Sequence, residues 1–225
     1  MNAAPSRDSL TRSVEDYLKA IYRLTSGGAP AATSEIAALL EISPPSVSAM
    51  VKRLSEQGLL AHVPYRGVEL TDSGRRAALR MIRRHRLIES YLVAHLGYTW
   101  DTVHEEAERL EHAVSDDLVE RMAEALGDPA FDPHGDPIPS PDGSMAAHAF
   151  TPLAELPVGA DAVVRRVATG DPARLRYVAD LGLQPGAHVH VAAREPFGGP
   201  IKLATGEGEQ VVGGELASLL LCEPE

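Results

Sequence analysis

The sequence has very little cysteine and no long hydrophobic run. Its one cysteine, Cys222, cannot form an intramolecular disulfide or a thiolate metal site, and no stretch approaches the roughly 18 apolar residues of a membrane span. The opening residues, MNAAPSRDSLTRSVEDY, lack the apolar segment of a secretory signal. These absences argue against a secreted or membrane protein, and we expect a cytoplasmic location.

Motifs of common enzyme classes are also missing. A zinc-protease helix needs His-Glu-x-x-His, but the residue four positions after His104 is Glu108, so an essential ligand is lost. The chain shows no nucleophile motif and no glycine-rich phosphate loop. We do not expect an enzyme, although a dinuclear histidine–carboxylate site for hydrolysis or redox chemistry stays open as an alternative. A third hypothesis makes the C-terminal region a protein-interaction module with a purely structural metal.

Charge is divided unevenly along the 225 residues, whose formal net charge is −11 at pH 7. Residues 1–95 hold 13 Lys and Arg against 9 Asp and Glu, whereas residues 96–225 hold 8 against 23. A mildly basic N-terminal part followed by an acidic remainder is compatible with a DNA-binding face in the first third of the chain. Charge alone is equally compatible with a protein that has no nucleic-acid partner.

Hydrophobic spacing predicts helices over most of the first 127 residues, with one short hairpin between them. Helix starts are indicated by capping hydroxyls and by proline, and helix ends by glycine. The predicted elements are, in order, a helix over 10–26, a short helix capped by Thr33 or Ser34, a helix from Pro44 to Gly58, extended segments over 59–64 and 67–71, a helix over 72–96, and one helix from Thr99 or Asp101 to Gly127.

The remaining residues predict a linker and a small β-barrel. Residues 128–150 contain five prolines and no periodicity, as is typical of a linker that passes from ordered to flexible. Short β-rich runs separated by glycine and proline follow it. They cover 161–167, 187–193, 201–204 and 209–212.

Residues 33–60 carry the pattern of a helix-turn-helix, in which the start of the second helix enters a major groove. Such a helix needs small polar residues at its entrance and basic residues near phosphates, and the hairpin tip at 65–67 resembles a wing. The alternative is an ordinary helical hairpin, but the continuation through 70–74 is typical of winged-helix proteins. The candidate DNA-binding residues are Ser43, Pro45, Ser46, Ser48, Lys52, Arg53 and Arg66.

Two of the predicted helices carry candidate metal ligands. His85 and Glu89 are four residues apart and therefore share one helical face. On the next helix, the same spacing rule places His104, Glu108, Glu111 and His112 on one face. Glutamate and histidine on amphipathic helices are usually solvated, and Glu108 with Arg109 nearby could simply be ion-paired. Six donors on neighbouring helices nevertheless favour a metal site.

The sequence resembles the diphtheria toxin repressor family of iron- and manganese-dependent regulators along nearly its whole length. The resemblance lies in 14–22, the winged helix, 84–89, 104–112, the linker signature at 132–139 and 181–186 in the tail. It implies a winged helix-turn-helix domain at 1–73, a helical metal-binding and dimerisation domain at 74–140, a linker at 141–152 and an SH3-like β-domain at 153–225. A homodimer that binds a palindromic operator and represses metal-uptake genes is implied as well.

The resemblance also implies two sets of metal ligands, and hence up to two metal ions per subunit. Iron-type members have methionine and cysteine where this chain has Asp16 and Glu108, and carboxylates suit Mn²⁺ better. Lys19 stands where manganese-type members often have a second acid, and Fe²⁺ stays open. The primary set would be Asp16, Glu108, Glu111 and His112, and the ancillary set His85, Glu89 and His104, with Asp171 as a further ligand.

Overall fold

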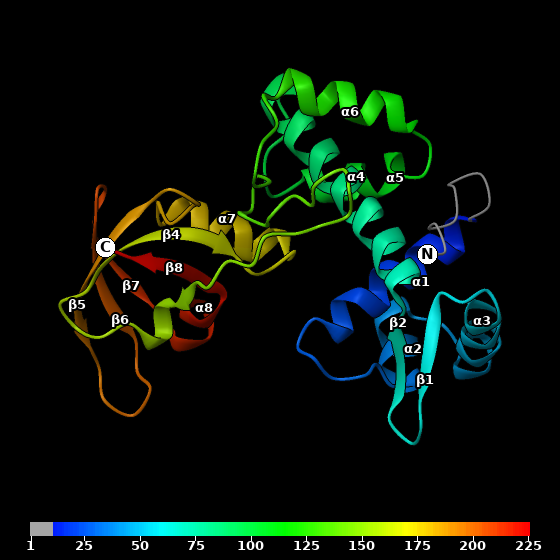
Figure 1. Ribbon diagram of the computed structural model, residues 1–225. Helices are drawn as coiled ribbons and strands as arrows, with labels where there is room; N and C mark the ends of the chain where they lie inside the picture. Colours follow the sequence, from blue (N-terminus) through cyan, green and yellow to red (C-terminus); the bar gives the residue numbers. More distant parts are fainter. Residues whose placement is uncertain (1–10) are drawn as a thin grey trace. The chain divides into compact units, whose positions relative to one another are not determined.

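The computed structural model describes residues 11–225, and these form two compact units (Figure 1). The first unit runs to His85 and includes Pro139–Met145, and the second comprises Arg86–Ile138 and Ala146–Glu225. The first ten residues, which include Leu10 as the predicted start of the first helix, lie outside the described residues. No helix in the described part of the chain is both long and apolar enough to cross a membrane.

The first unit is a winged helix, as predicted. Helix α2 packs against both α1 and α3, and the β1–β2 hairpin packs on α1 and α3. Leu18, Ile36 and Leu54 are fully buried in their shared apolar core. The elements are α1 (Arg12–Thr25), α2 (Thr33–Leu40), α3 (Pro44–Glu56), β1 (Leu60–Val63), β2 (Gly67–Leu70) and the first part of α4 (Asp72–Leu96).

The start of α3 follows the predicted chemistry, but the start of α2 does not. Ser43 is the N-cap of α3, and its hydroxyl accepts a hydrogen bond from the backbone N–H of Ser46 at 3.4 Å. The predicted cap of α2 at Thr33 or Ser34 is wrong, because both residues are already helical and Ala32 is the N-cap. There the N–H of Ala32 donates to the carboxylate of Glu35 at 2.8 Å, which is the half of a capping box that needs no capping hydroxyl.

Gly67 allows the wing to lie against the chain that precedes α2. Its φ is +123°, and a Cβ at this position would be 2.1 Å from the carbonyl oxygen of Ala31. The next residue, Val68, exchanges two backbone hydrogen bonds with Ala31, of 2.9 and 3.0 Å. Only glycine fits here, because any side chain would push the two backbones apart.

The helical part of the second unit contains a break that the sequence analysis did not predict. The single helix expected up to Gly127 is two helices, α5 (Val103–Leu110) and α6 (Asp116–Ala125). Ser115 begins α6, since its hydroxyl accepts from the N–H of Leu118 at 3.2 Å and two aspartates follow in the first turn. The remainder of α4 packs with both helices through buried Leu87, Ile88, Val103, Val119 and neighbouring side chains.

The C-terminal part of the second unit is the predicted SH3-like β-domain, with helices added. Its antiparallel sheet has the order β3-β8-β4-β5-β6-β7. The four predicted strands are present, whereas β3, β8 and both helices were not predicted. The elements are β3 (Thr151–Pro152), a 3-10 turn (Leu153–Glu155), β4 (Asp161–Val167), α7 (Pro172–Asp180), β5 (His188–Arg194), β6 (Ile201–Thr205), β7 (Gly208–Val212), α8 (Gly214–Leu219) and β8 (Leu220–Pro224).

The segment expected to be a linker begins as an ordered loop. One carboxylate oxygen of Asp132 accepts backbone hydrogen bonds from His134 at 2.8 Å and from Asp136 at 2.9 Å. Phe131 and Pro137 form a β-bridge across the loop, and the N–H of Val167 on β4 donates to the carbonyl of His134 at 2.9 Å. This proline-rich segment is therefore a tight turn docked on the β-domain. Side-chain and backbone acceptors satisfy its N–H groups in place of the hydrogen bonds of a helix or sheet.

Candidate metal centre and DNA-binding face

Two predicted ligands lie just beyond α5, and the expectation of four ligands on one helical face is wrong. Glu111 is the C-cap of α5, and His112 follows in the turn that leads to α6. The Glu111 side chain is 0% exposed, and one of its oxygens is 3.4 Å from Nε2 of His112. A carboxylate withdrawn from water needs a cation or strong donors nearby, and an adjacent imidazole nitrogen suits a shared metal.

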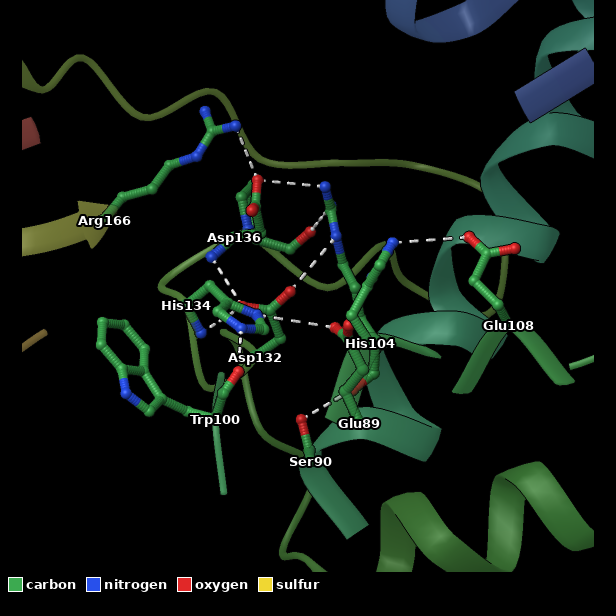
Figure 2. Close-up of polar contacts among 11 residues, drawn as sticks. Glu89, Ser90, Trp100, His104, Glu108, Asp132, His134, Asp136 and Arg166 are labelled. Carbon is green, nitrogen blue, oxygen red and sulfur yellow. Dashed lines mark hydrogen bonds and ion pairs between the residues drawn. The ribbon is translucent and has the colours of Figure 1, made fainter. Parts of the chain in front are cut away.

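Three further predicted ligands meet where α4 faces α5 within the second unit (Figure 2). Nδ1 of His104 is 3.0 Å from Oε1 of Glu89, and its Nε2 is 3.7 Å from Oε1 of Glu108. The Glu89 side chain is only 3% exposed, whereas that of His104 is half exposed. The imidazole thus lies between a buried and an exposed carboxylate, and all three side chains carry donor atoms that a divalent cation binds.

Asp16, His85 and Asp171 complete the set of predicted ligands. Asp16 on α1 is half-buried and His85 on α4 is buried, and both belong to the first unit. Asp171 in the β-domain is the N-cap of α7, where its carboxylate accepts from the N–H of Ala173 at 2.8 Å. Capping by itself accounts for an aspartate at this position.

Sequence reasoning missed two buried polar residues beside Glu89, namely Asp132 and His134 (Figure 2). Nδ1 of His134 is 3.8 Å from Oε2 of Glu89 and 4.0 Å from Oδ1 of Asp132. Burial, together with the nearby carboxylates of Asp136 and Glu89, raises the pKa of Asp132 to about 7, although His134 and Arg86 act in the opposite direction. The signal was the polar sequence DPHGD inside a proline-rich segment, which was interpreted only as a linker.

Arginines fix the loop of Asp132 to its neighbours. Asp136 accepts from Arg86 on α4 at 3.1 Å and from Arg166 on β4 at 2.8 Å. Arg86 also lies 3.6 Å from the second oxygen of Asp132. The loop is therefore held to the helix that carries Glu89 and to the β-domain by the same ionic network.

The DNA-binding candidates form an exposed group at the start of α3 and at the wing. The buried face of α3 consists of Val47, Val51 and Leu54, so its opposite face is left for a partner. Ser43 and Ser46 exchange a hydrogen bond of 2.8 Å between their hydroxyls. All seven predicted residues are exposed, namely Ser43, Pro45, Ser46, Ser48, Lys52, Arg53 and Arg66.

Comparison with known proteins agrees with this arrangement of domains. Residues 9–68 match the N-terminal DNA-binding domain of iron-dependent repressors, and residues 71–140 match their metal-binding and dimerisation domain. Residues 151–224 match the FeoA domain. The iron-dependent repressor IdeR of Mycobacterium leprae is 36% identical over 228 residues, which covers 96% of this chain and 99% of the relative. The diphtheria toxin repressor of Corynebacterium glutamicum is 33% identical over 81% of this chain and 84% of its own length.

This chain belongs to the diphtheria toxin repressor family. A solved manganese-dependent transcriptional repressor in complex with manganese has a TM-score of 0.86 and 41% identity, over 94% of this chain and all of that one. The repressor ScaR with bound Zn²⁺ has a TM-score of 0.77 and 36% identity, over 93% and 98% of the two chains.

Membership of the diphtheria toxin repressor family decides between the functional alternatives. The family consists of transcriptional repressors and not of enzymes, so the hydrolase or redox alternative is set aside. Its two N-terminal domains make DNA and a second copy of the chain the partners of this protein. The protein is thus a metal-dependent, DNA-binding repressor.

Proposed function

We propose that this repressor responds to Mn²⁺, with Fe²⁺ as the second candidate, and that it controls genes of metal uptake. The observation that carries the proposal is buried Glu111 beside His112, and Asp16 and Glu108 would complete the donor set. These ligands offer oxygen and nitrogen and no sulfur, which suits Mn²⁺ better than a site with methionine and cysteine. Among its relatives, one solved repressor is bound to manganese and another to Zn²⁺, and IdeR is iron-dependent.

Two metal sites per subunit are proposed. The primary site uses Asp16, Glu108, Glu111 and His112, and the ancillary site uses His85, Glu89 and His104. The short distances from His104 to both Glu89 and Glu108 support a site where α4 meets α5. Asp171 could join the ancillary site through Oδ2 while its Oδ1 keeps the hydrogen bond from the N–H of Ala173.

Control of DNA binding follows from where the primary ligands lie in the chain. Asp16 is on α1, directly before the helix-turn-helix, whereas Glu111 and His112 lie in the dimerisation domain. Without a cation the carboxylates of Asp16, Glu108 and Glu111 repel one another, which leaves α1 and the helix-turn-helix less constrained. Neutralising that repulsion shifts the population towards a DNA-competent arrangement. By linkage, DNA then strengthens metal binding by the same factor.

On DNA, the hydroxyls at the start of α3 would face base edges, while Lys52, Arg53 and Arg66 would contact phosphates. Their exposure supports this division of roles. A homodimer reads a palindrome whose half-sites lie about one helical turn, roughly 34–36 Å, apart. Binding to the operator would take place in the cytoplasm.

The test is a fluorescence-anisotropy titration on the protein's own promoter with chelator, with Mn²⁺ and with Fe²⁺. Tight binding is expected only with metal, and Asp16→Ala should abolish the metal response while the circular dichroism spectrum stays the same. Asp180→Ala, which removes an exposed carboxylate of α7, is the matched control and should behave as wild type. Equally tight binding by the chelator-treated protein would refute metal control.

A further inference from the structure

Trp100 lies between α4 and α5, in a segment that we call the α4–α5 connector (residues 97–102), yet its side chain belongs to the apolar core of the β-domain. The residue is 8% exposed, and every other buried member of that cluster in the described chain lies between Leu153 and Cys222. Among the described residues, the clusters that join α4 to α5 and α6 do not include it. In Figure 2 its indole is turned away from Glu89. A large aromatic ring from the helical part is thus buried in the adjoining β-domain.

The residue after Trp100 makes an ionic contact with the same domain. Nη1 of Arg176 on α7 donates a hydrogen bond to Oδ2 of Asp101 at 3.1 Å, and the Asp101 side chain is only 11% exposed. A hydrogen bond from Thr99 and the charge of Arg176 lower the pKa of Asp101, although burial opposes them, so the carboxylate remains ionised. The connector is therefore fixed to the β-domain by a charge-assisted hydrogen bond as well as by the indole.

Helix α5 begins directly after the connector and depends on tertiary contacts for its position. It has only eight residues, and its N-cap, Thr102, makes no side-chain capping hydrogen bond. Helices of this length are marginal in water on their own. On one side α5 packs on α4 through fully buried Val103 and Ala107. The contacts of Trp100 and Asp101 with the β-domain provide a second anchor, at the start of the helix.

This second anchor lies close to a proposed metal ligand. His104 is in the first turn of α5, four residues after Trp100, and its Nδ1 is 3.0 Å from Oε1 of Glu89 on α4. The imidazole is half exposed, so its own burial does little to hold it. Bonds to a bound metal stay within roughly 0.2 Å of their usual lengths. A small displacement of the start of α5 would therefore spoil the placement of His104 relative to Glu89.

We propose that Trp100 and Asp101 are positioning residues through which the β-domain holds His104 in place for metal binding, a role that does not require the β-domain to donate a ligand. The inference rests on the proposed function, in which His104 and Glu89 are ligands of the ancillary site. Contacts that orient a ligand strengthen metal binding because the ligand is in place before the ion arrives. Loss of either contact should therefore weaken the ancillary site and leave the primary site unchanged.

The experiment follows each site separately in the full-length protein with ¹⁵N-labelled histidine. Zn²⁺, buffered by a competing chelator, is titrated while the imidazole resonances of His104 and His112 report the ancillary and the primary site. In Trp100→Ala, His104 should need about 10- to 100-fold more free Zn²⁺ for half-saturation, the range for residues that orient metal ligands, whereas His112 should saturate as in wild type. Trp100→Phe keeps an aromatic ring and should recover most of the affinity. The matched control is Tyr98→Ala, which removes a more exposed ring of the same connector and should titrate as wild type.

A variant on the other side of the contact guards against misfolding. The Arg176 side chain is 58% exposed, so Arg176→Met should leave the thermal unfolding curve nearly unchanged and still weaken Zn²⁺ binding at His104. Its control is Arg165→Met, because the partner of Arg165, Glu223 at 2.7 Å, also belongs to the β-domain. Trp100 is the sole tryptophan of the chain, so its fluorescence emission checks that the indole stays buried in both variants.

Equal His104 titrations in wild type, Trp100→Ala and Arg176→Met would overturn the positioning role. A loss of affinity shared equally by His104 and His112 would overturn it as well, because it would indicate general destabilisation. If operator binding needs metal while the His104 titrations are equal, the positioning role is rejected and the proposed function stands. Operator binding that is independent of metal rejects the proposed function, and a selective loss at His104 in both variants would still support the positioning role.

Discussion

Replacing Gly67 by alanine should damage the wing and leave metal binding intact. The new Cβ would lie 2.1 Å from the carbonyl oxygen of Ala31, and φ is +123°, where an L side chain is strained. Relief requires β2 to move away from Ala31, which breaks the two hydrogen bonds between Ala31 and Val68. Backbone strain of roughly 1–3 kcal/mol and about 1 kcal/mol for each lost bond give a destabilisation of about 3–5 kcal/mol.

The assay compares Gly67→Ala with Gly27→Ala, whose added Cβ meets nothing within 4 Å. Urea unfolding should show a loss of stability for the first variant and a change within about 0.5 kcal/mol for the second. Operator affinity should also fall for Gly67→Ala because Arg66 is its neighbour at the wing tip, while Mn²⁺ stoichiometry stays unchanged. If both variants unfolded at the same urea concentration and bound the operator alike, the close approach of the wing to Ala31 would be refuted.

Further predictions concern phosphate contacts and pH. Arg66→Ala or Lys52→Ala should weaken binding to every DNA sequence and reduce the slope of log K against log salt by about 0.9 per lost contact. Anisotropy titrations at several salt concentrations measure this slope. Slopes equal to that of wild type would contradict phosphate contact. In metal-free protein, the pKa of Asp132 is raised to about 7, so between about pH 4 and 7 the unfolded chain releases a proton that the folded chain keeps. The free energy of unfolding should therefore fall as pH rises through this window, and Asp132→Asn should flatten the fall in urea titrations with chelator; parallel curves for the two proteins would argue against the raised pKa.

Local patterns were enough to predict much of the first unit. Ser43 followed by two prolines marks the start of α3, and the helix over 72–96 has the bounds of α4. Capping and periodicity act within a few residues, so they can be read directly from the sequence. The break between α5 and α6 has a local signal of the same kind in Ser115-Asp116-Asp117, which was overlooked because apolar periodicity continues through it. The family resemblance supplied the two proposed ligand sets.

The sequence by itself therefore determined the winged helix, the order of the domains and the residue types that a metal would need. Only the tertiary structure decided that His134 and Asp132 lie beside Glu89, because more than forty residues separate them and their loop has no periodicity. Their position depends on the hydrogen bond to Trp100, the docking on β4 and the arginines around Asp136. Each of these contacts joins residues far apart in the chain, and packing of the whole second unit is what brings them together.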